Sequence, residues 1–203
     1  MNKLKLLSLA AIVVAICFAG TGSGYEVGDL VSDFKLKNVD GKMISLSEYG
    51  SGKGVILIFD CNTCPYSKAY NDRIIGLHKK YSSAGFPVLA INANDPQLSP
   101  GDSFDAMVSY AKEKGYAFPY LVDQTQEVAR AFGASNTPHV YVLKRDNKSF
   151  KVAYKGAIDN NTKDAASADK KYVEDAVDAL VAGKDITTTK TKAIGCTIKW
   201  RNM

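Results

Sequence analysis

Short, continuous apolar runs alternate with amphipathic segments along most of this 203-residue chain. The runs are rich in β-branched residues, which is typical of strands buried on both faces of a sheet. We expect strands at 55–59, 88–91, 119–122, 139–143 and 150–158. Apolar residues that recur every three or four positions predict helices. These run from Cys64 to Gly85, from Asp102 or Ser103 to Gly115, from Asp123 to Gly133, and from Tyr172 to Gly183.

The two ends of this pattern differ from its middle. Phe34 and Leu36 alternate with polar residues, and Asp40-Gly41 is a hairpin signal, so a β-hairpin is expected ahead of the first buried strand. A polar stretch follows the last helix and leads to a short tail. With no internal repeat and no linker, the pattern predicts one α/β domain over 25–186 and a tether and tail over 187–203.

Residues 1–24 have the layout of a secretory signal peptide. Lys3 and Lys5 give a basic start, an apolar stretch follows, and small residues fill the cleavage zone. The apolar stretch is shorter than the roughly 20 residues that a membrane span needs. Ile16 is bulky where lipoprotein processing requires a small residue, which argues against lipidation of Cys17. We expect a periplasmic, cell-envelope or secreted protein with no integral membrane span after cleavage; an uncleaved anchor or a buried first helix is the alternative.

Charge and cysteine content exclude some classes of function. The formal net charge of +5 falls to +3 without residues 1–24, because that segment carries two lysines and no acid. Charges of both signs are mixed and no basic cluster interleaves with aromatic residues, which argues against nucleic-acid binding. No Gly-rich phosphate loop follows a strand, so no nucleotide cofactor is expected. Export implies an oxidising compartment, where cysteines tend to pair, and Cys61, Cys64 and Cys196 remain after cleavage.

The strongest chemical signal is Cys61-Asn62-Thr63-Cys64, placed directly after the strand predicted at 55–59 and at the start of a predicted helix. Two thiols three residues apart can close a small disulfide ring where the backbone turns. A helix start supplies that turn, together with unpaired N–H groups and a positive dipole end that favour thiolate over thiol. Because thiolate is the nucleophile in disulfide exchange, we predict a redox-active pair whose sulfurs lie close together and within reach of a partner.

The order of the predicted elements resembles the thioredoxin fold with one inserted strand–helix unit. Residues 27–46 are similar to the N-terminal segment of redoxins, the group of the alkyl hydroperoxide reductase/thiol-specific antioxidant proteins. Further stretches resemble one thioredoxin-like redoxin family: CNTCPY at 61–66, AINAND at 90–95, FPYLVD at 118–123, TPH at 137–139 and GCTIKW at 195–200. The resemblance spans nearly all of residues 25–203. It implies a central mixed sheet flanked by helices and an exported thiol–disulfide oxidoreductase.

The same resemblance implies roles for individual residues. Cys61 takes the position of the attacking cysteine and Cys64 that of the resolving cysteine. Thr137-Pro138 matches the loop that presents a cis-proline beside the active disulfide, and it leaves the backbone of Thr137 free to pair with a bound peptide. The implied partners are protein thiols and disulfides and an upstream electron donor, with no cofactor and no metal.

Asp60 departs from the thioredoxin pattern, in which tryptophan precedes the first cysteine. A carboxylate at this position opposes ionisation of Cys61. The buried acid that thioredoxins carry on the preceding strand would fall at Val55, so the usual proton acceptor is missing. Two interpretations of Asp60 stay open: a substitute proton acceptor, or a solvated acid in a loop.

A thiol-dependent, antioxidant peroxidase of the peroxiredoxin type is the first alternative. Peroxiredoxins place proline seven residues, and threonine or serine three residues, before the peroxidatic cysteine. Gly54 and Ile58 occupy these positions relative to Cys61, and the corresponding positions relative to Cys64 fit no better. Arg73, the nearest arginine, lies a few helical turns downstream. The motif therefore argues against a peroxidase.

A copper-binding module is the second alternative, and it requires Cys61, Cys64 and His139 to converge on a soft ion. Thioredoxin-fold copper chaperones space their cysteines one residue wider, so the match is poor. Cys196 is either a third redox partner that folds back over the site or a buried small hydrophobic residue, and the second interpretation is the commoner one for a free cysteine. Trp200 is expected to anchor the tail by burying its ring.

Overall fold

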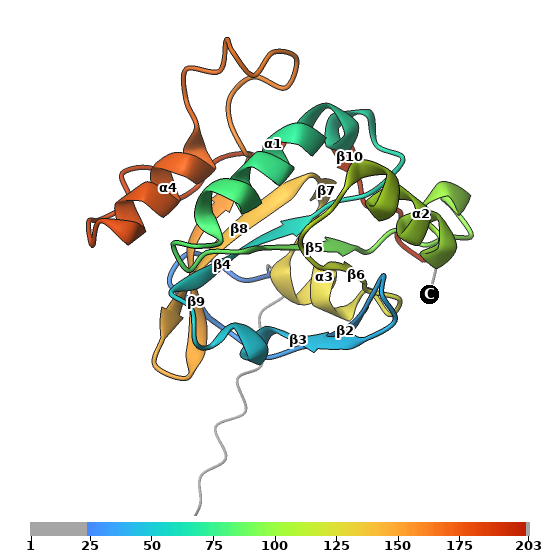
Figure 1. Cartoon of the computed structure of the whole chain (residues 1–203), viewed down its shortest axis with the longest axis horizontal. Helices are drawn as coiled ribbons and strands as arrows, with labels where there is room; N and C mark the ends of the chain where they lie inside the picture. The colour runs from blue at the N-terminus through green and yellow to red at the C-terminus, as the bar shows by residue number, and fades with distance from the viewer. Residues whose placement is uncertain (1–23, 202–203) are drawn as a thin grey trace, which may run out of the picture.

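The computed structural model describes residues 24–201, so Cys17 and all but the last residue of the predicted signal peptide lie outside the described residues. Within this range, eight strands form one mixed sheet with helices on both faces (Figure 1). The strand order is β1-β9-β8-β4-β5-β6-β2-β3. The predicted α/β class with a central mixed sheet is confirmed.

The apolar runs predicted as strands all form strands, with bounds that differ by one to three residues. Three short strands, at 30–31, 136–137 and 196–197, were not predicted. Ten strands are described in all. They are β1 (Leu30–Val31), β2 (Lys35–Asn38), β3 (Met43–Ser45), β4 (Gly54–Phe59), β5 (Val88–Asn92), β6 (Tyr120–Val122), β7 (Asn136–Thr137), β8 (His139–Asp146), β9 (Ser149–Gly156) and β10 (Cys196–Thr197). The helices are α1 (Pro65–Tyr81), α2 (Phe104–Lys114), α3 (Glu127–Phe132) and α4 (Tyr172–Val181), with short 3-10 turns η1 (Leu46–Tyr49) and η2 (Pro100–Asp102). The hairpin expected near Asp40-Gly41 is β2–β3.

Strand β4 is the centre of the sheet and leads into the site. It pairs in parallel with β5 and antiparallel with β8, and all of its residues are buried. Because side chains alternate across a strand, Ile56 and Ile58 face one layer while Leu57 and Phe59 face the other. A strand covered on both faces cannot carry polar residues, which explains its continuous apolar sequence.

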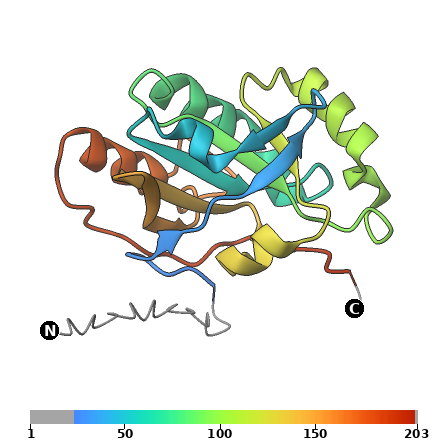
Figure 2. The same ribbon diagram turned by 90° about the horizontal axis from the view of Figure 1, so that it is seen from below.

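The two faces of the sheet carry separate cores. Helices α1, α2 and α4 cover one face, with Tyr70, Ile74 and Val173 among the buried residues. Helix α3, the N-terminal segment and the C-terminal tail cover the other, around Phe132 (Figures 1 and 2). Within residues 24–201, no helix combines the length and apolarity needed to cross a membrane.

Helix α3 begins later than the sequence pattern predicts. The expectation was a start at Asp123, but the helix begins at Glu127. Gln126 is left-handed, with φ 62°, and the carboxylate of Asp123 accepts a hydrogen bond from the backbone N–H of Ala129 at 2.8 Å. The chain therefore makes a side-chain-stabilised turn before the helix starts. Helix α2 follows its prediction, with Ser103 as N-cap and a left-handed Gly115 at its end.

The segment predicted as a polar tether packs along the domain. The backbone of Lys155 in β9 pairs with Thr189 and Thr191, and the tail then passes beside α3 (Figure 2, red). Ile198 is 3% exposed and belongs to the core beneath α3. Trp200 is half-buried, with the Arg130 guanidinium 4.5 Å from its ring centre. The tail is thus part of the folded domain.

Candidate active site

The C-x-x-C segment forms the bend between β4 and α1. Cys64 has extended backbone angles and is the N-cap of α1, and Pro65 occupies the first helical position, where its missing N–H costs no hydrogen bond. Cys61 lies three residues earlier, in the bend itself. The favourable end of the helix dipole therefore acts most directly on Cys64, whereas the sequence resemblance implied that Cys61 is the attacking residue.

Both sulfurs converge on Thr137. The Sγ of Cys61 lies 3.1 Å from the Thr137 hydroxyl oxygen, and the Sγ of Cys64 donates to the Thr137 carbonyl oxygen at 3.1 Å. The Thr137–Pro138 peptide bond is cis. The structure therefore brings Cys61 and Cys64 together with Thr137 and the cis-proline Pro138, which lie more than 70 positions later in the sequence.

A buried carboxylate fixes the bend between the cysteines. Asp102, considered above as a helix cap, instead points into this loop, and Ser103 caps α2. Its oxygens accept hydrogen bonds from Asn62 N (2.7 Å), Thr63 Oγ1 (2.7 Å), Asn92 Nδ2 (3.0 Å), Asn94 Nδ2 (2.9 Å) and Ser99 Oγ (2.6 Å). Burial raises the pKa of Asp102, but these donors outweigh it and hold the pKa below its ordinary value.

The surroundings shift the pKa values of the two thiols in opposite directions. The neighbouring Cys61 thiol, the Cys196 side chain and the backbone N–H groups of Ser67 and Cys196 lower the pKa of Cys64 despite its burial. Interaction with Cys64, burial and the negative charge of Asp102 raise the pKa of Cys61. These shifts favour ionisation of Cys64 over that of Cys61. In the arrangement described, Cys64 keeps the proton that it donates to the Thr137 carbonyl oxygen, so this hydrogen bond is lost when Cys64 ionises.

Asp60 is not a solvated loop acid. It is 1% exposed, and burial raises its pKa to about 7, against the opposing hydrogen bonds from Ser67 and the Cys61 backbone. Within residues 24–201, its Oδ1 has no hydrogen-bond partner. Of the two interpretations left open by the sequence, the structure therefore agrees with a buried acid next to Cys61 that can exchange a proton near neutral pH.

Both site sulfurs are covered. Cys61 is 1% and Cys64 3% exposed, while Cys196 is only half-buried. Strand β10 lies antiparallel on β7, with Cys196 opposite Thr137, beside the N-terminal end of α1 (Figure 1). Both sulfurs are therefore buried against Thr137, and the tail pairs with the backbone of the same residue.

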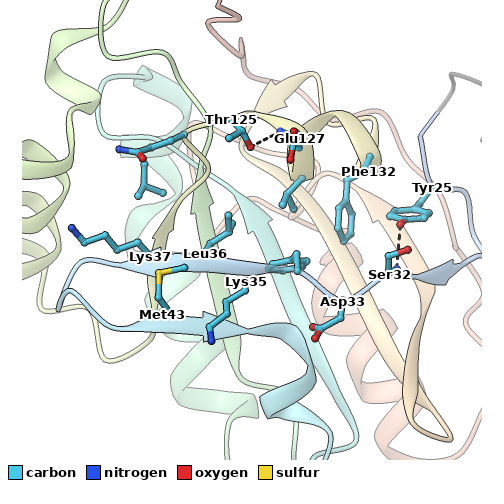
Figure 3. A pocket seen from close by; sticks show the side chains of 15 residues that line it. Tyr25, Ser32, Asp33, Lys35, Leu36, Lys37, Met43, Thr125, Glu127 and Phe132 are labelled. Carbon is cyan, nitrogen blue, oxygen red and sulfur yellow. Dashed lines mark hydrogen bonds between the residues drawn. The ribbon is translucent and has the colours of Figure 1, made fainter.

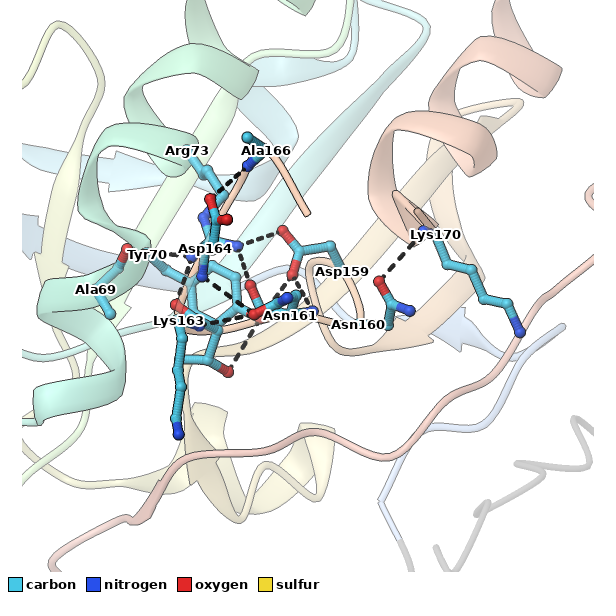
Figure 4. A network of polar contacts seen from close by, with 11 residues as sticks. Ala69, Tyr70, Arg73, Asp159, Asn160, Asn161, Lys163, Asp164, Ala166 and Lys170 are labelled. Carbon is cyan, nitrogen blue, oxygen red and sulfur yellow. Dashed lines mark hydrogen bonds and ion pairs between the residues drawn. The ribbon is translucent and has the colours of Figure 1, made fainter. Parts of the chain in front are cut away.

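Arg73, the arginine considered for a peroxidase, is engaged elsewhere. Its guanidinium donates to Asp159 at 2.6 Å and to the carbonyl oxygens of Asn161 and Thr162 (Figure 4). Tyr70 donates to the same carboxylate at 2.8 Å. This network joins the loop after β9 to α1, and the Arg73 guanidinium is engaged in it.

His139 is a core residue. Its ring lies 4.8 Å from that of Tyr141, and burial together with the charge of Lys155 lowers its pKa to about 4. Across the described part of the chain, no three His, Cys, Asp or Glu side chains are grouped so that they could hold a metal ion. The convergence of Cys61, Cys64 and His139 that the copper alternative needs is therefore not present there.

Two surface hollows differ in their relation to the site. One, of about 710 Å³, lies between α1 and α2 and includes Asn62 and Thr63 of the C-x-x-C segment. The other, of about 610 Å³, lies between the β2–β3 hairpin and α3 and is lined by residues such as Lys35, Leu36 and Phe132 (Figure 3). The first hollow adjoins the reacting groups and the second does not.

The chain matches known proteins over most of its length. Residues 27–158 match the AhpC/TSA family. The chain belongs to this family. It is 24% identical over 166 residues to the thiol-disulfide oxidoreductase ResA of Geobacillus thermodenitrificans, a match that covers 75% of this chain and 89% of the relative.

Solved structures give the same fold. A conserved protein from Geobacillus kaustophilus is similar with a TM-score of 0.82 and 35% identity, covering 88% of this chain and 94% of that one. A putative thiol:disulfide interchange protein DsbE from Chlorobium tepidum aligns with a TM-score of 0.59 and 24% identity, over 77% and 98% of the two chains, and shows the fold alone. The predicted class, a thioredoxin-like thiol–disulfide oxidoreductase of the AhpC/TSA family, is confirmed at that level.

Sequence inspection missed Asp102 as a site residue. The sequence pointed to such a site only indirectly, through the polar residues Asn92, Asn94 and Ser99 at and beyond the end of a buried strand. Polar side chains at the carboxyl end of a parallel strand often line a site in open α/β sheets, and here they surround the carboxylate that binds the C-x-x-C loop.

Proposed function

We propose that Cys61 and Cys64 form a dithiol/disulfide pair that exchanges with disulfides of partner proteins. The single observation that carries this proposal is the convergence of both sulfurs on Thr137, each at 3.1 Å from one of its oxygens. Two thiols held by one residue next to a helix start are placed for the reversible formation of a disulfide.

Cys64 makes the first attack in this proposal. Cys64 is the N-cap of α1, and its pKa is lowered, so its ionised form is favoured. Its thiolate attacks one sulfur of the partner disulfide, a mixed disulfide forms, and the other partner sulfur leaves as a thiolate. These roles reverse those implied by the family resemblance, because the helix begins after the second cysteine.

Cys61 then resolves the mixed disulfide. Its thiol loses a proton, its sulfur attacks Cys64, and the Cys61–Cys64 disulfide forms as the partner's second thiolate leaves. The partner gains two electrons and the pair loses two, so an upstream donor of reducing equivalents must restore the dithiol. Asp60, a buried acid with a pKa raised by burial to about 7, accepts the proton of Cys61.

A partner disulfide reaches Cys64 when β10 moves off β7, because the tail otherwise covers both sulfurs. A partner strand then pairs with the backbone of Thr137. The hollow beside Asn62 and Thr63 gives the rest of the partner a place to dock. We also propose that segment 1–24, which has the layout of a signal peptide, exports the chain, so that this reaction takes place in the periplasm, at the cell envelope or outside the cell.

The test is trapping with serine variants of Cys61 and Cys64. Both variants carry Cys196→Ser in addition, so that no third thiol next to Cys64 can displace the partner. Cys64→Ser is then expected to abolish the dithiothreitol-dependent reduction of insulin, and Cys61→Ser to accumulate a mixed disulfide at Cys64, identified by peptide mapping. Trapping at Cys61 in the Cys64→Ser variant would restore the roles implied by the resemblance. Full activity in both variants would contradict the proposal.

A further inference from the structure

The C-terminal tail occupies the place where a partner strand would bind. Strand β10 pairs antiparallel with β7, with Cys196 opposite Thr137 and Thr197 opposite Asn136. The side-chain amide of Asn136 donates to the carbonyl oxygen of Gly195 at 2.9 Å. The backbone of Thr137, which the sequence predicted would bind a peptide, is therefore already paired with this chain's own tail.

The tail is held on both sides of Cys196. Before it, the Thr191 hydroxyl lies in contact with Tyr154 Oη at 2.6 Å and accepts from the backbone N–H of Ala157 at 2.9 Å. After it, Ile198 is buried and its N–H donates to Ser135 at 3.0 Å. Cys196 is consequently presented at a fixed place.

Gly195 is needed for this close approach. A Cβ at this position would lie 2.0 Å from the carbonyl oxygen of Thr137, a clash with rigid backbone. Any larger residue would lift the tail off β7. Glycine therefore allows the next residue, Cys196, to lie directly against the reacting pair.

The contacts of Cys196 are those of a reacting group. Cys196 lies opposite Thr137 in the β7–β10 pair, and the carbonyl oxygen of Thr137 is 3.1 Å from the Sγ of Cys64. The Cys196 side chain lowers the pKa of Cys64, while burial and Cys64 raise the pKa of Cys196. It is half-buried, whereas a cysteine that served only as a small hydrophobic residue would be enclosed by apolar side chains. Cys64 thus has a second thiol within its immediate surroundings besides Cys61.

We propose that Cys196 is a third redox-active cysteine, which exchanges with the Cys61–Cys64 disulfide to form a Cys64–Cys196 disulfide. The Cys196 thiolate attacks Cys64 Sγ, the Cys64–Cys196 bond forms, and the Cys61–Cys64 bond breaks. Cys61 leaves as a thiolate and takes up the proton that Cys196 gave up. One disulfide replaces another, so no oxidant or reductant is consumed. The exchange moves the oxidised state from a buried pair to the half-buried tail.

This inference rests on the proposed function, since it requires a redox-active Cys64. The test uses the full chain with Cys17→Ser, so that Cys61, Cys64 and Cys196 are the only cysteines that can form a disulfide. In this background, Cys61→Ser is incubated with glutathione disulfide, quenched with acid, alkylated and mapped. We expect an intramolecular Cys64–Cys196 disulfide as the main product. Glutathione bound to Cys64 with Cys196 left free would overturn the inference.

Two further variants test the positioning of the tail. Gly195→Val in the same background is expected to lower the yield of the Cys64–Cys196 disulfide at least about tenfold, because the sulfurs separate beyond bonding distance. Thr197→Val, an exposed neighbour on β10, is the matched control and should keep the full yield. An unchanged yield in Gly195→Val would contradict the argument. Gly195→Ala replaces it if circular dichroism shows that the valine variant is unfolded.

The failure of this inference is distinguishable from that of the proposed function. If the chain with all three cysteines forms the Cys61–Cys64 disulfide and reduces insulin, while Cys61→Ser yields no Cys64–Cys196 disulfide, only this inference fails. A chain with all three cysteines that forms no Cys61–Cys64 disulfide and reduces no insulin would remove the proposed function itself.

Discussion

The carboxylate of Asp102 accepts a 2.7 Å hydrogen bond from the backbone N–H of Asn62, the residue that follows the first cysteine. The two residues are 40 positions apart. A second oxygen of the same carboxylate holds the Thr63 hydroxyl at 2.7 Å. The loop between the cysteines is therefore shaped by a residue of the segment between β5 and α2.

Replacing Asp102 with asparagine should weaken both the fold and the exchange reaction. The amide would present a donor to groups that are themselves donors, leaving buried N–H or O–H groups unpaired at a cost of about 1–3 kcal/mol. We expect a lower free energy of unfolding in urea and slower reduction of insulin. Asp105→Asn, on the exposed side of α2, is the control. Equal stability of the two variants would rule out this role.

Asp60→Asn should change the pH dependence of stability. Burial raises the pKa of Asp60 to about 7 from an ordinary value of 3.8. Between these values the folded protein binds more protons than the unfolded chain, so the free energy of unfolding falls as the pH rises towards 7 and then levels off.

The asparagine variant lacks this loss. Its free energy of unfolding should match that of the parent protein near pH 3.5. At pH 8 it should be larger by on the order of 4 kcal/mol, because the pKa of Asp60 rises from 3.8 to about 7 on folding. Urea unfolding at several pH values measures the difference. In the same variant, resolution of the mixed disulfide should be slower, because Cys61 loses its proton acceptor. Parallel pH–stability curves for the two proteins would contradict the buried-acid assignment.

Thr137→Val should raise the pKa of Cys61 further. The hydroxyl of Thr137 lies 3.1 Å from the Cys61 sulfur and lowers its pKa, and a hydrogen bond to a charged group contributes about 1.5–3 kcal/mol. Alkylation of Cys61 measured against pH, in a Cys196→Ser background, should shift to higher pH. Thr137→Ser retains the hydroxyl and should restore the original profile. A shift in both variants would instead point to a change in the backbone of the loop.

Ile198→Ala should destabilise the protein by about 2–4 kcal/mol, the usual cost of truncating a buried isoleucine. Ile198 is 3% exposed and packs in the core beneath α3. Ile194 lies on the same tail but is 52% exposed, so Ile194→Ala should change stability by less than about 0.5 kcal/mol. Thermal or urea unfolding compares them. Equal effects of the two substitutions would show that the tail is not part of the cooperative fold.

Local features of the sequence were sufficient for most of the elements. The continuous apolar run Val55–Phe59 predicted the central strand because burial on both faces leaves no place for polar residues. Gly115 and Gly133 marked helix ends because both adopt positive φ there. The C-x-x-C spacing and the Thr137-Pro138 pair could also be recognised in the sequence, because each is a motif of a few neighbouring residues.

The tertiary structure alone decided what surrounds these motifs. Whether Cys61 or Cys64 caps α1 depends on where the helix begins, and a shift of three residues exchanges the two roles. The contact of Asp102 with Asn62, and that of Gly195 with Asn136 across 59 positions, joins segments whose spacing follows no helical or strand period. Such contacts are fixed by how the sheet and the tail pack together, which no periodicity along the chain encodes.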